Sequence, residues 1–327
     1  MNKRGKRYSV ILNPAILLVL LLASWISAGF ISLPYTGGEW IPAVISFTDI
    51  SQMGESLSRY IATMLLIVNA LSLYSIGLKR LTTGVNKFLL PVIYLLFAMI
   101  SPASLRFSGA AAAAPLVLWS LYFSISSKQS DLHLFISGFL ASIAALFEPT
   151  LGLLVLLAVS MAFYSRGVNP RSLVMMISSV FLPLIFILSI RHLLFDDARL
   201  FAELYFEEFI NISPLEFTIK SFADLVLYIA ISIVLISAIW HIYQKMRSYK
   251  IEKARAISRF VLMLLTIIII VFLFPVSSLS IAPVISIPVS IIINEYLLNY
   301  DKSNKHKIQW IILLALMLVA RISEIIR

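Results

Sequence analysis

The sequence contains no cysteine among its 327 residues, and only 13% of the residues are charged. Without cysteine the chain can form no disulfide, thiolate zinc site, iron–sulfur cluster or thiolate nucleophile. Soluble domains carry about 25% charged and about 45–50% apolar residues. Here apolar residues reach 60% and the mean hydropathy is +0.97. This composition excludes a soluble globular domain, a disordered chain and a disulfide-rich scaffold.

Motifs that bind nucleotides or metals are also missing. The chain has neither the G-x-x-x-x-G-K-[ST] phosphate loop nor the G-x-G-x-x-G dinucleotide motif. Its four histidines, at positions 133, 192, 241 and 306, are scattered and lack the short spacing of metal ligands on a helix. We therefore expect no cofactor and no metal site, and an ATP-driven pump within this chain alone is disfavoured.

Long apolar runs are what the sequence has in abundance. A helix needs about 20 mostly apolar residues to cross the ~30 Å hydrocarbon core of a bilayer. The sequence predicts an all-α, polytopic transmembrane helical bundle in a single membrane domain, residues 1–327. The two apolar segments that meet at Glu148-Pro149 form either a helical hairpin or one kinked unit. About eleven spans are predicted, the first an uncleaved anchor, at residues 9–31, 60–78, 87–103, 106–126, 132–148, 149–165, 172–190, 222–241, 258–275, 280–298 and 308–323.

The charges indicate how these spans are oriented, because cytoplasmic loops collect Lys and Arg. If the spans alternate from a cytoplasmic N-terminus, 19 of the 26 basic residues fall inside, with only three acids. The net charge of +10 is thus mainly a signal of topology. Nucleic acid is not expected as a partner, because no basic face carries groove-reading or stacking elements.

Two long loops are predicted on the outer side, residues 32–59 and 191–221, and each contains an amphipathic stretch. In the first, apolar residues recur at three- to four-residue steps from Val44 to Leu57. In the second, residues 200–210 place Glu203 and Glu207 on one helical face and aromatic side chains on another. We expect helices at the membrane surface, the second one packing over the protein's own outer end or against a partner.

Charges within or beside apolar spans are candidates for function, because they are costly in lipid. Those singled out are Glu39, Arg106, Glu148 and the pair Arg191-His192, all expected near the outer face. Each is alternatively an interfacial residue whose charged end reaches the headgroups. Glu148 is alternatively a cap that accepts from the free N–H groups of the next helix.

The order of spans and outer loops over residues 1–240 resembles that of the GT-C superfamily of membrane glycosyltransferases, which use polyprenyl-linked sugar donors. The resemblance implies a catalytic acid in the first outer loop, where Glu39 and Asp49 are the candidates, and phosphate ligands at Arg106 and Arg191. Glu148 and His192 complete the candidate substrate-binding residues. The acidic pair that the family carries directly after the first span is missing, and residues 241–327 would be additional helices.

Residues 134–147 and 287–297 also resemble small uncharacterised inner-membrane proteins of Bacteroidota, which implies a bacterial inner (cytoplasmic) membrane. Three functions stay open. The protein binds or transfers from a lipid-linked glycan at the periplasmic face, it is a non-catalytic subunit or scaffold of an envelope complex that docks through residues 191–221, or it is a transporter. An outward cavity joining Glu39, Arg106 and Arg191 would favour the first function, and a shallow outer face with an exposed apolar helix at 200–210 the second.

Overall fold

The computed structural model describes residues 55–76, 88–100, 102–125, 131–166, 170–210, 222–273, 281–299, 309, 311–317 and 319. Every regular element in these ranges is helical. The α-helices are α2 (Glu55–Ile76), α3 (Leu89–Ala98), α4 (Gly109–Ile125), α5 (Asp131–Phe147), α6 (Gly152–Arg166), α7 (Pro170–Phe195), α8 (Ala198–Ile210), α9 (Phe222–Lys245), α10 (Ile251–Leu273) and α11 (Ala282–Asn299). Short 3-10 helices lie at η5 (Pro102–Leu105), η6 (Pro149–Leu151) and η7 (Met246–Ser248).

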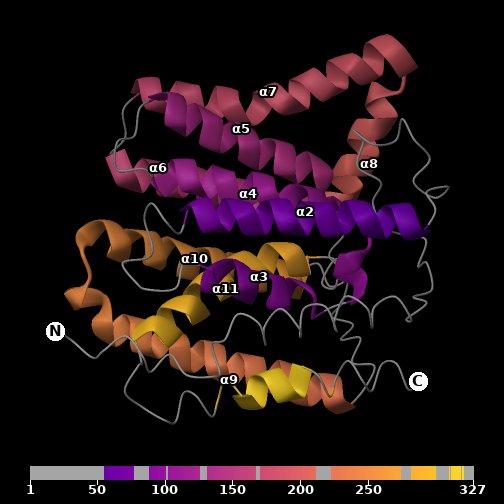
Figure 1. Ribbon diagram of the computed structural model, residues 1–327. Helices are drawn as coiled ribbons and strands as arrows, with labels where there is room; N and C mark the ends of the chain where they lie inside the picture. Colours follow the sequence, from indigo (N-terminus) through magenta and orange to yellow (C-terminus); the bar gives the residue numbers. More distant parts are fainter. Residues whose placement is uncertain are drawn as a thin grey trace.

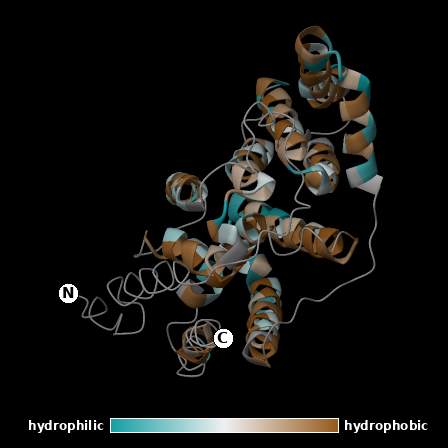
Figure 2. Ribbon diagram, turned by 90° about the vertical axis from the view of Figure 1, so that its right-hand side faces the viewer, coloured by the Kyte–Doolittle hydropathy of each residue, from teal (hydrophilic) through white to brown (hydrophobic). Residues whose placement is uncertain are grey.

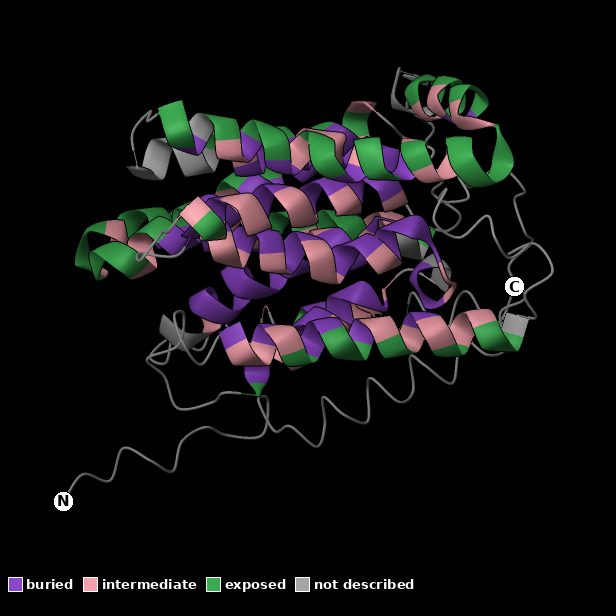
Figure 3. Ribbon diagram, turned by 90° about the horizontal axis from the view of Figure 1, so that it is seen from above, coloured by how far each residue is buried: buried purple, intermediate pink, exposed green. Residues whose placement is uncertain are grey.

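Most of these helices lie side by side along one direction, and α8 lies across one end of the bundle (Figure 1). Buried residues fill the helices in the middle, and exposed residues lie on the outer sides (Figure 3). The main core is formed by residues of α2, α3, α4, α9, α10 and α11 together, with contributions from α5 and α6. The main apolar core is thus built from helices that are far apart in sequence, and smaller buried clusters join α5 to α6, α7 and α8.

Four described helices, α2, α7, α9 and α10, are long and apolar enough to cross a membrane. Their outer faces are apolar too: on α9 the exposed residues recur at three- to four-residue steps at positions 229, 233, 236, 240 and 243. Such a stripe would be unfavourable in water but suits contact with lipid. The prediction of a helical membrane bundle is confirmed at this level. The count of eleven spans stays a prediction, because the span at 9–31 lies outside the described residues.

The relative direction of α4 and α5 follows from two contacts, one between the middles of the helices and one between the start of α4 and the end of α5. Ser120 of α4 and Ser137 of α5 each donate to the other's backbone carbonyl, while Gly109 of α4 faces Phe147 at the far end of α5. The two helices are thus antiparallel. We call the end of the bundle that holds the start of α4 the α8 end, and the opposite end, where α4 finishes, the basic end.

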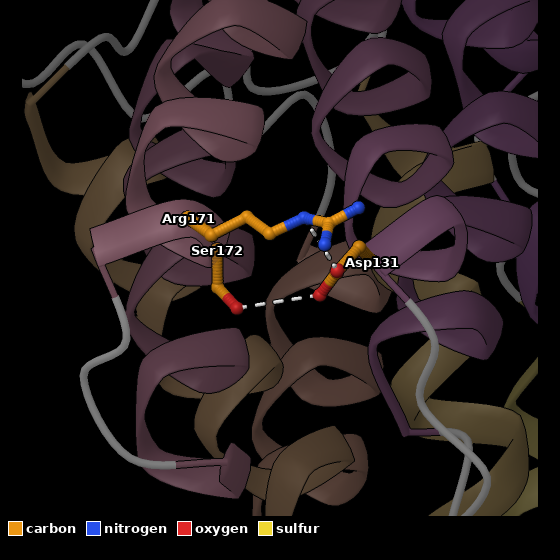
Figure 4. Close-up of polar contacts among 3 residues, drawn as sticks. All are labelled: Asp131, Arg171 and Ser172. Atoms are coloured by element: carbon orange, nitrogen blue, oxygen red, sulfur yellow. Dashed lines mark hydrogen bonds and ion pairs between the residues drawn. The ribbon is translucent and has the colours of Figure 1, made fainter.

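By contrast, α5 and α7 run parallel. Asp131 at the start of α5 pairs with Arg171 at 3.3 Å and accepts from Ser172 at 3.4 Å (Figure 4). At the far end of the same two helices, Leu146 and Ile187 share a buried cluster. The chain passes from α5 through α6 to α7. If successive helices run in opposite directions through the bundle, α5 and α7 must run in the same direction, as observed.

Some predicted boundaries were wrong. The helix that contains the span predicted at 258–275 begins at Ile251, because the basic segment before residue 258 is helical and its Lys253 pairs with Glu295. The span predicted at 87–103 is divided into α3 and η5, since Pro102 lacks an N–H group and disfavours helical geometry in the residue before it. The helix predicted at 200–210 is confirmed as α8.

Gly138 allows α5 and α7 to approach closely, because a Cβ at this position would overlap the side chain of Ser179. We expect Gly138→Ala to lower the thermal unfolding midpoint of the full chain in detergent, since overpacking costs about 1–3 kcal/mol. Adding Ser179→Ala removes the hydroxyl that the new methyl group meets, so the double variant should regain most of the loss. A double variant no more stable than Gly138→Ala would contradict this explanation.

Candidate functional site

Glu148 lies buried at the α8 end, between α5 and η6, with only 7% of its surface exposed. Its carboxylate Oε1 accepts a hydrogen bond from the Thr150 hydroxyl at 2.9 Å. It makes no side-chain bond to the backbone at the start of the following helix. The alternative of an N-cap on that helix, considered from the sequence, is thus not the role that the structure gives it.

The same carboxylate faces the first turn of α4. A Cβ built on Gly109 would lie 3.1 Å from Glu148 Oε2 and would overlap the carbonyl oxygen of Phe147. Gly109 is therefore needed for the close approach of α4 to the end of α5. The N–H groups at a helix N-terminus carry partial positive charge, so the start of α4 stabilises a negative charge on Glu148.

Arg106 lies in the segment just before α4 and is half-buried. The N–H of Phe107 donates to Ser58 Oγ at 2.9 Å, which ties this segment to the first turns of α2. The segment of Arg106 and the carboxylate of Glu148 therefore both lie beside the start of α4.

The Arg191 side chain makes its contacts at the corner between α7 and α8. Its Nη2 lies 3.0 Å from Asp197 Oδ2, and its guanidinium carbon lies 5.5 Å and 5.3 Å from the ring centres of Phe195 and Phe201. Only 14% of the arginine side chain is exposed. At the corner itself Asp196 has φ +54°, a left-handed conformation that Asp adopts more readily than most residues. A phosphate ligand would have to compete with Asp197 for this arginine.

His192 points elsewhere, although it is the next residue in the chain. Its imidazole is 71% exposed, and Nδ1 lies 3.7 Å from Oδ1 of the even more exposed Asp196. The predicted pair Arg191-His192 is thus divided: the arginine turns inward to α8 and the histidine turns outward.

Helix α8 covers the end of α5 with one face. Phe201 is 3% exposed and packs with Leu146 and Ile187, and the Tyr205 hydroxyl donates to the Ala145 carbonyl at 3.1 Å. Burial raises the pKa of Tyr205 to about 12, so its phenol stays protonated and remains a donor. Seen from the α8 end, the ribbon of this helix alternates between hydrophobic and hydrophilic residues (Figure 2). The prediction that the segment packs over the protein's own end is confirmed.

The other face of α8 is open. Leu200, Leu204 and Phe206 are 58%, 47% and 51% exposed, and Glu203 and Glu207 are exposed beside them. We call these five residues the outer face of α8. It combines apolar side chains with acidic ones at the end of a membrane bundle.

A second group of buried charges, at the basic end, was not identified as a site from the sequence. Lys253 Nζ of α10 lies 2.8 Å from Glu295 Oε1 of α11, with side chains 15% and 5% exposed. Arg259 Nη1 donates to the backbone carbonyl of Ser124 at 2.7 Å. The spacing of residues in the sequence could have identified them. Ala256, Phe260 and Met263 form a buried stripe on α10, Arg259 lies within this stripe, and Lys253 extends it by one turn toward the start of the helix.

The candidate catalytic acids Glu39 and Asp49 lie outside the described residues. In the part of the chain that is described, no three His, Asp or Glu side chains lie close enough together to hold a metal ion. What the α8 end offers is therefore a buried carboxylate with a hydroxyl donor, a half-buried arginine nearby, and a surface helix that covers one side.

Comparison with protein families adds one finding. A family of unknown function, DUF6427, matches residues 26–326. The chain belongs to this family. The match covers all of the described helices, from α2 to α11, so the DUF6427 unit is not confined to residues 1–240. No curated protein and no solved structure matches this DUF6427 chain.

In this DUF6427 chain the ion pair of Arg191 should hold α8 in place. Arg191→Gln leaves Asp197 without its partner, at a cost between the ~0.2–1 kcal/mol of exposed pairs and the ~3–5 kcal/mol of buried ones. Because the sequence has no cysteine, Leu146→Cys, beneath α8, gives a single reporter thiol. We expect Arg191→Gln to speed its maleimide labelling roughly tenfold.

The matched control is Arg199→Gln on α8 itself. Arg199 pairs with Glu203 at 2.9 Å, but this arginine side chain is 93% exposed. Its loss should change labelling of the same thiol by less than about threefold, in line with a surface pair. Equal labelling rates for the two arginine variants would show that Arg191 does not hold the corner.

Proposed function

We propose that this protein is a non-catalytic membrane subunit or scaffold of a bacterial envelope complex, and that it binds its partner through the outer face of α8. The supporting observation is that Leu200, Leu204 and Phe206 are about half exposed or more on a helix whose opposite face is already packed. An exposed apolar helix at 200–210 is one of the two features expected for this function, the other being a shallow outer face.

The charge of the outer face favours a protein partner over the lipid surface. Helices that lie on anionic membranes usually present Lys and Arg on their polar face. Here one basic residue, Arg199, pairs with Glu203, but the α8 segment also carries Glu207 and Glu208, so its net charge is negative and anionic headgroups would repel it. A partner that presents an apolar groove bordered by Lys or Arg would bury the leucines and the phenylalanine and balance this negative charge.

The proposed orientation puts the α8 end in the periplasm and the N-terminus in the cytoplasm, in the inner membrane. The support comes from the distribution of charge. Lys245, Arg247, Lys250 and Arg255 are at the basic end, together with Arg171, and short cytoplasmic loops are enriched in such residues.

The test uses Leu204→Cys as the only thiol in the chain. In whole cells, a membrane-impermeant crosslinker that joins a thiol to a lysine amine should give a product of higher mass, because the partner is expected to be basic. Reversing the charges with Glu203→Lys and Glu207→Lys should lower the yield at least about tenfold, since like charges across an interface cost several kcal/mol. Both glutamates are exposed, so the fold should be unaffected.

Phe186→Cys provides the control, because this residue is 68% exposed in the middle of α7 and should be surrounded by lipid. It should give no product with the same reagent. A product from Leu204→Cys that is insensitive to the charge reversal would overturn the proposed interface. Reaction in inverted vesicles but not in whole cells would overturn the orientation.

In a second candidate function, the protein is a glycosyltransferase that uses a polyprenyl-phosphate-linked sugar and acts on a lipid-linked glycan at the α8 end. The observation that favours it is the buried carboxylate of Glu148 at the start of α4, close to the segment of Arg106. A carboxylate in this place could accept a proton from an acceptor hydroxyl, and the arginine could bind a phosphate.

The variant Glu148→Gln separates the two candidates. Gln keeps an oxygen that can accept from Thr150 and loses only the charge, which near a helix N-terminus contributes about 0.3–1 kcal/mol. As a scaffold the protein should tolerate this change, so we expect full complementation of a deletion strain at unchanged protein level. Complete loss of complementation with normal expression would instead support the glycan function.

A further inference from the structure

Two lipid-facing stripes end in basic residues where α9 joins α10. The exposed stripe of α9 passes through Ile236, Trp240 and Tyr243, and Arg247 follows four residues later in η7. On α10 the exposed positions recur in the same way, at residues 251, 255, 258, 262 and 265. Arg255 therefore belongs to the face of α10 that meets lipid, one turn from its start.

The basic residues of this segment divide into two groups. Those that point inward have protein partners: Lys253 pairs with Glu295, and Arg259 donates to the carbonyl of Ser124. Three that point outward, Arg247, Lys250 and Arg255, are exposed. Among the described residues, no carboxylate lies within ion-pair distance of these three cations.

We propose that Arg247, Lys250 and Arg255 form a binding site for the phosphate of an anionic phospholipid, such as phosphatidylglycerol. Residues 245–259 contain one acid, Glu252, which is exposed but lies outside ion-pair distance of the three cations, so the lipid phosphate would supply their partner. Basic residues directly beside a membrane helix attract anionic headgroups by about 1 kcal/mol each. The site lies at the opposite end from α8 and does not depend on the proposed function.

The surroundings of the three cations favour a lipid over a soluble phosphate. Trp240, Tyr243 and Ile251 are 64%, 72% and 77% exposed and adjoin the basic residues along the two stripes. Trp and Tyr gather at the level of the headgroups, where a ring contacts the acyl chain region and its polar atom contacts water. A free phosphate ion would make no use of these apolar side chains, whereas a phospholipid contacts them with its chains.

The first test measures which lipids stay with the protein. Full-length protein is purified from mixed micelles that hold equal amounts of phosphatidylglycerol and phosphatidylcholine, and the retained lipids are counted by native mass spectrometry. Phosphatidylglycerol should be retained at least about tenfold more often, as expected for two or more basic residues near one phosphate. Equal retention would overturn the proposal. Release of the lipid by millimolar inorganic phosphate would overturn it too, because the site would then bind phosphate ions.

The second test uses variants that differ in charge. Arg255→Gln should reduce the preference for phosphatidylglycerol roughly fivefold, and Arg255→Lys should keep most of it, since about 1 kcal/mol is attributed to each charge. Arg199→Gln removes one exposed charge at the α8 end and serves as the matched control, with no change expected. A reduction of similar size in Arg255→Gln and Arg199→Gln would show a general effect of net charge and contradict a local site.

Discussion

A polar group inside a bilayer has no water to bind, and this constraint governs the interior of the protein. Many hydroxyls that would otherwise be buried and unsatisfied donate to helix carbonyls, as Ser142 does to Val180 across α5 and α7. Asn69 donates its amide to the Tyr94 hydroxyl between α2 and α3 at 2.7 Å. Polar residues thus join neighbouring helices at specific heights and add selectivity to contacts that apolar packing alone would leave interchangeable.

The same constraint explains why the charged residues divide between inside and outside. At the basic end Lys253 pairs with Glu295 and Arg259 donates to a carbonyl, whereas the exposed cations follow the apolar stripes of α9 and α10. At the α8 end Arg191 satisfies the rule with Asp197 and two aromatic rings, and Glu148 satisfies it with Thr150 and the start of α4. An isolated charge singled out from sequence is therefore often half of a structural pair.

Sequence patterns predicted the helical class, most of the described helices to within a few residues, and α8, because apolar runs and three- to four-residue spacing are local properties. They could not give the partner of Arg191, since that depends on the angle at which α8 leaves α7. The start of α10 was misplaced for a related reason: Lys253 looks like a loop residue until Glu295 is brought beside it. Glu39 and Asp49 stay predictions.

Contacts at three levels fix the register of α7 relative to α5. Asp131, Gly138 and Leu146 each meet a residue 41 positions later, namely Ser172, Ser179 and Ile187. Sliding α7 by one residue would move it about 1.5 Å and disturb all three levels at once. Since α8 follows the last turn of α7, its distance from the opposite end of the bundle is set by all three levels together. The loss of one level leaves two others that hold α7 in register, so the position of α8 tolerates the loss of any single contact.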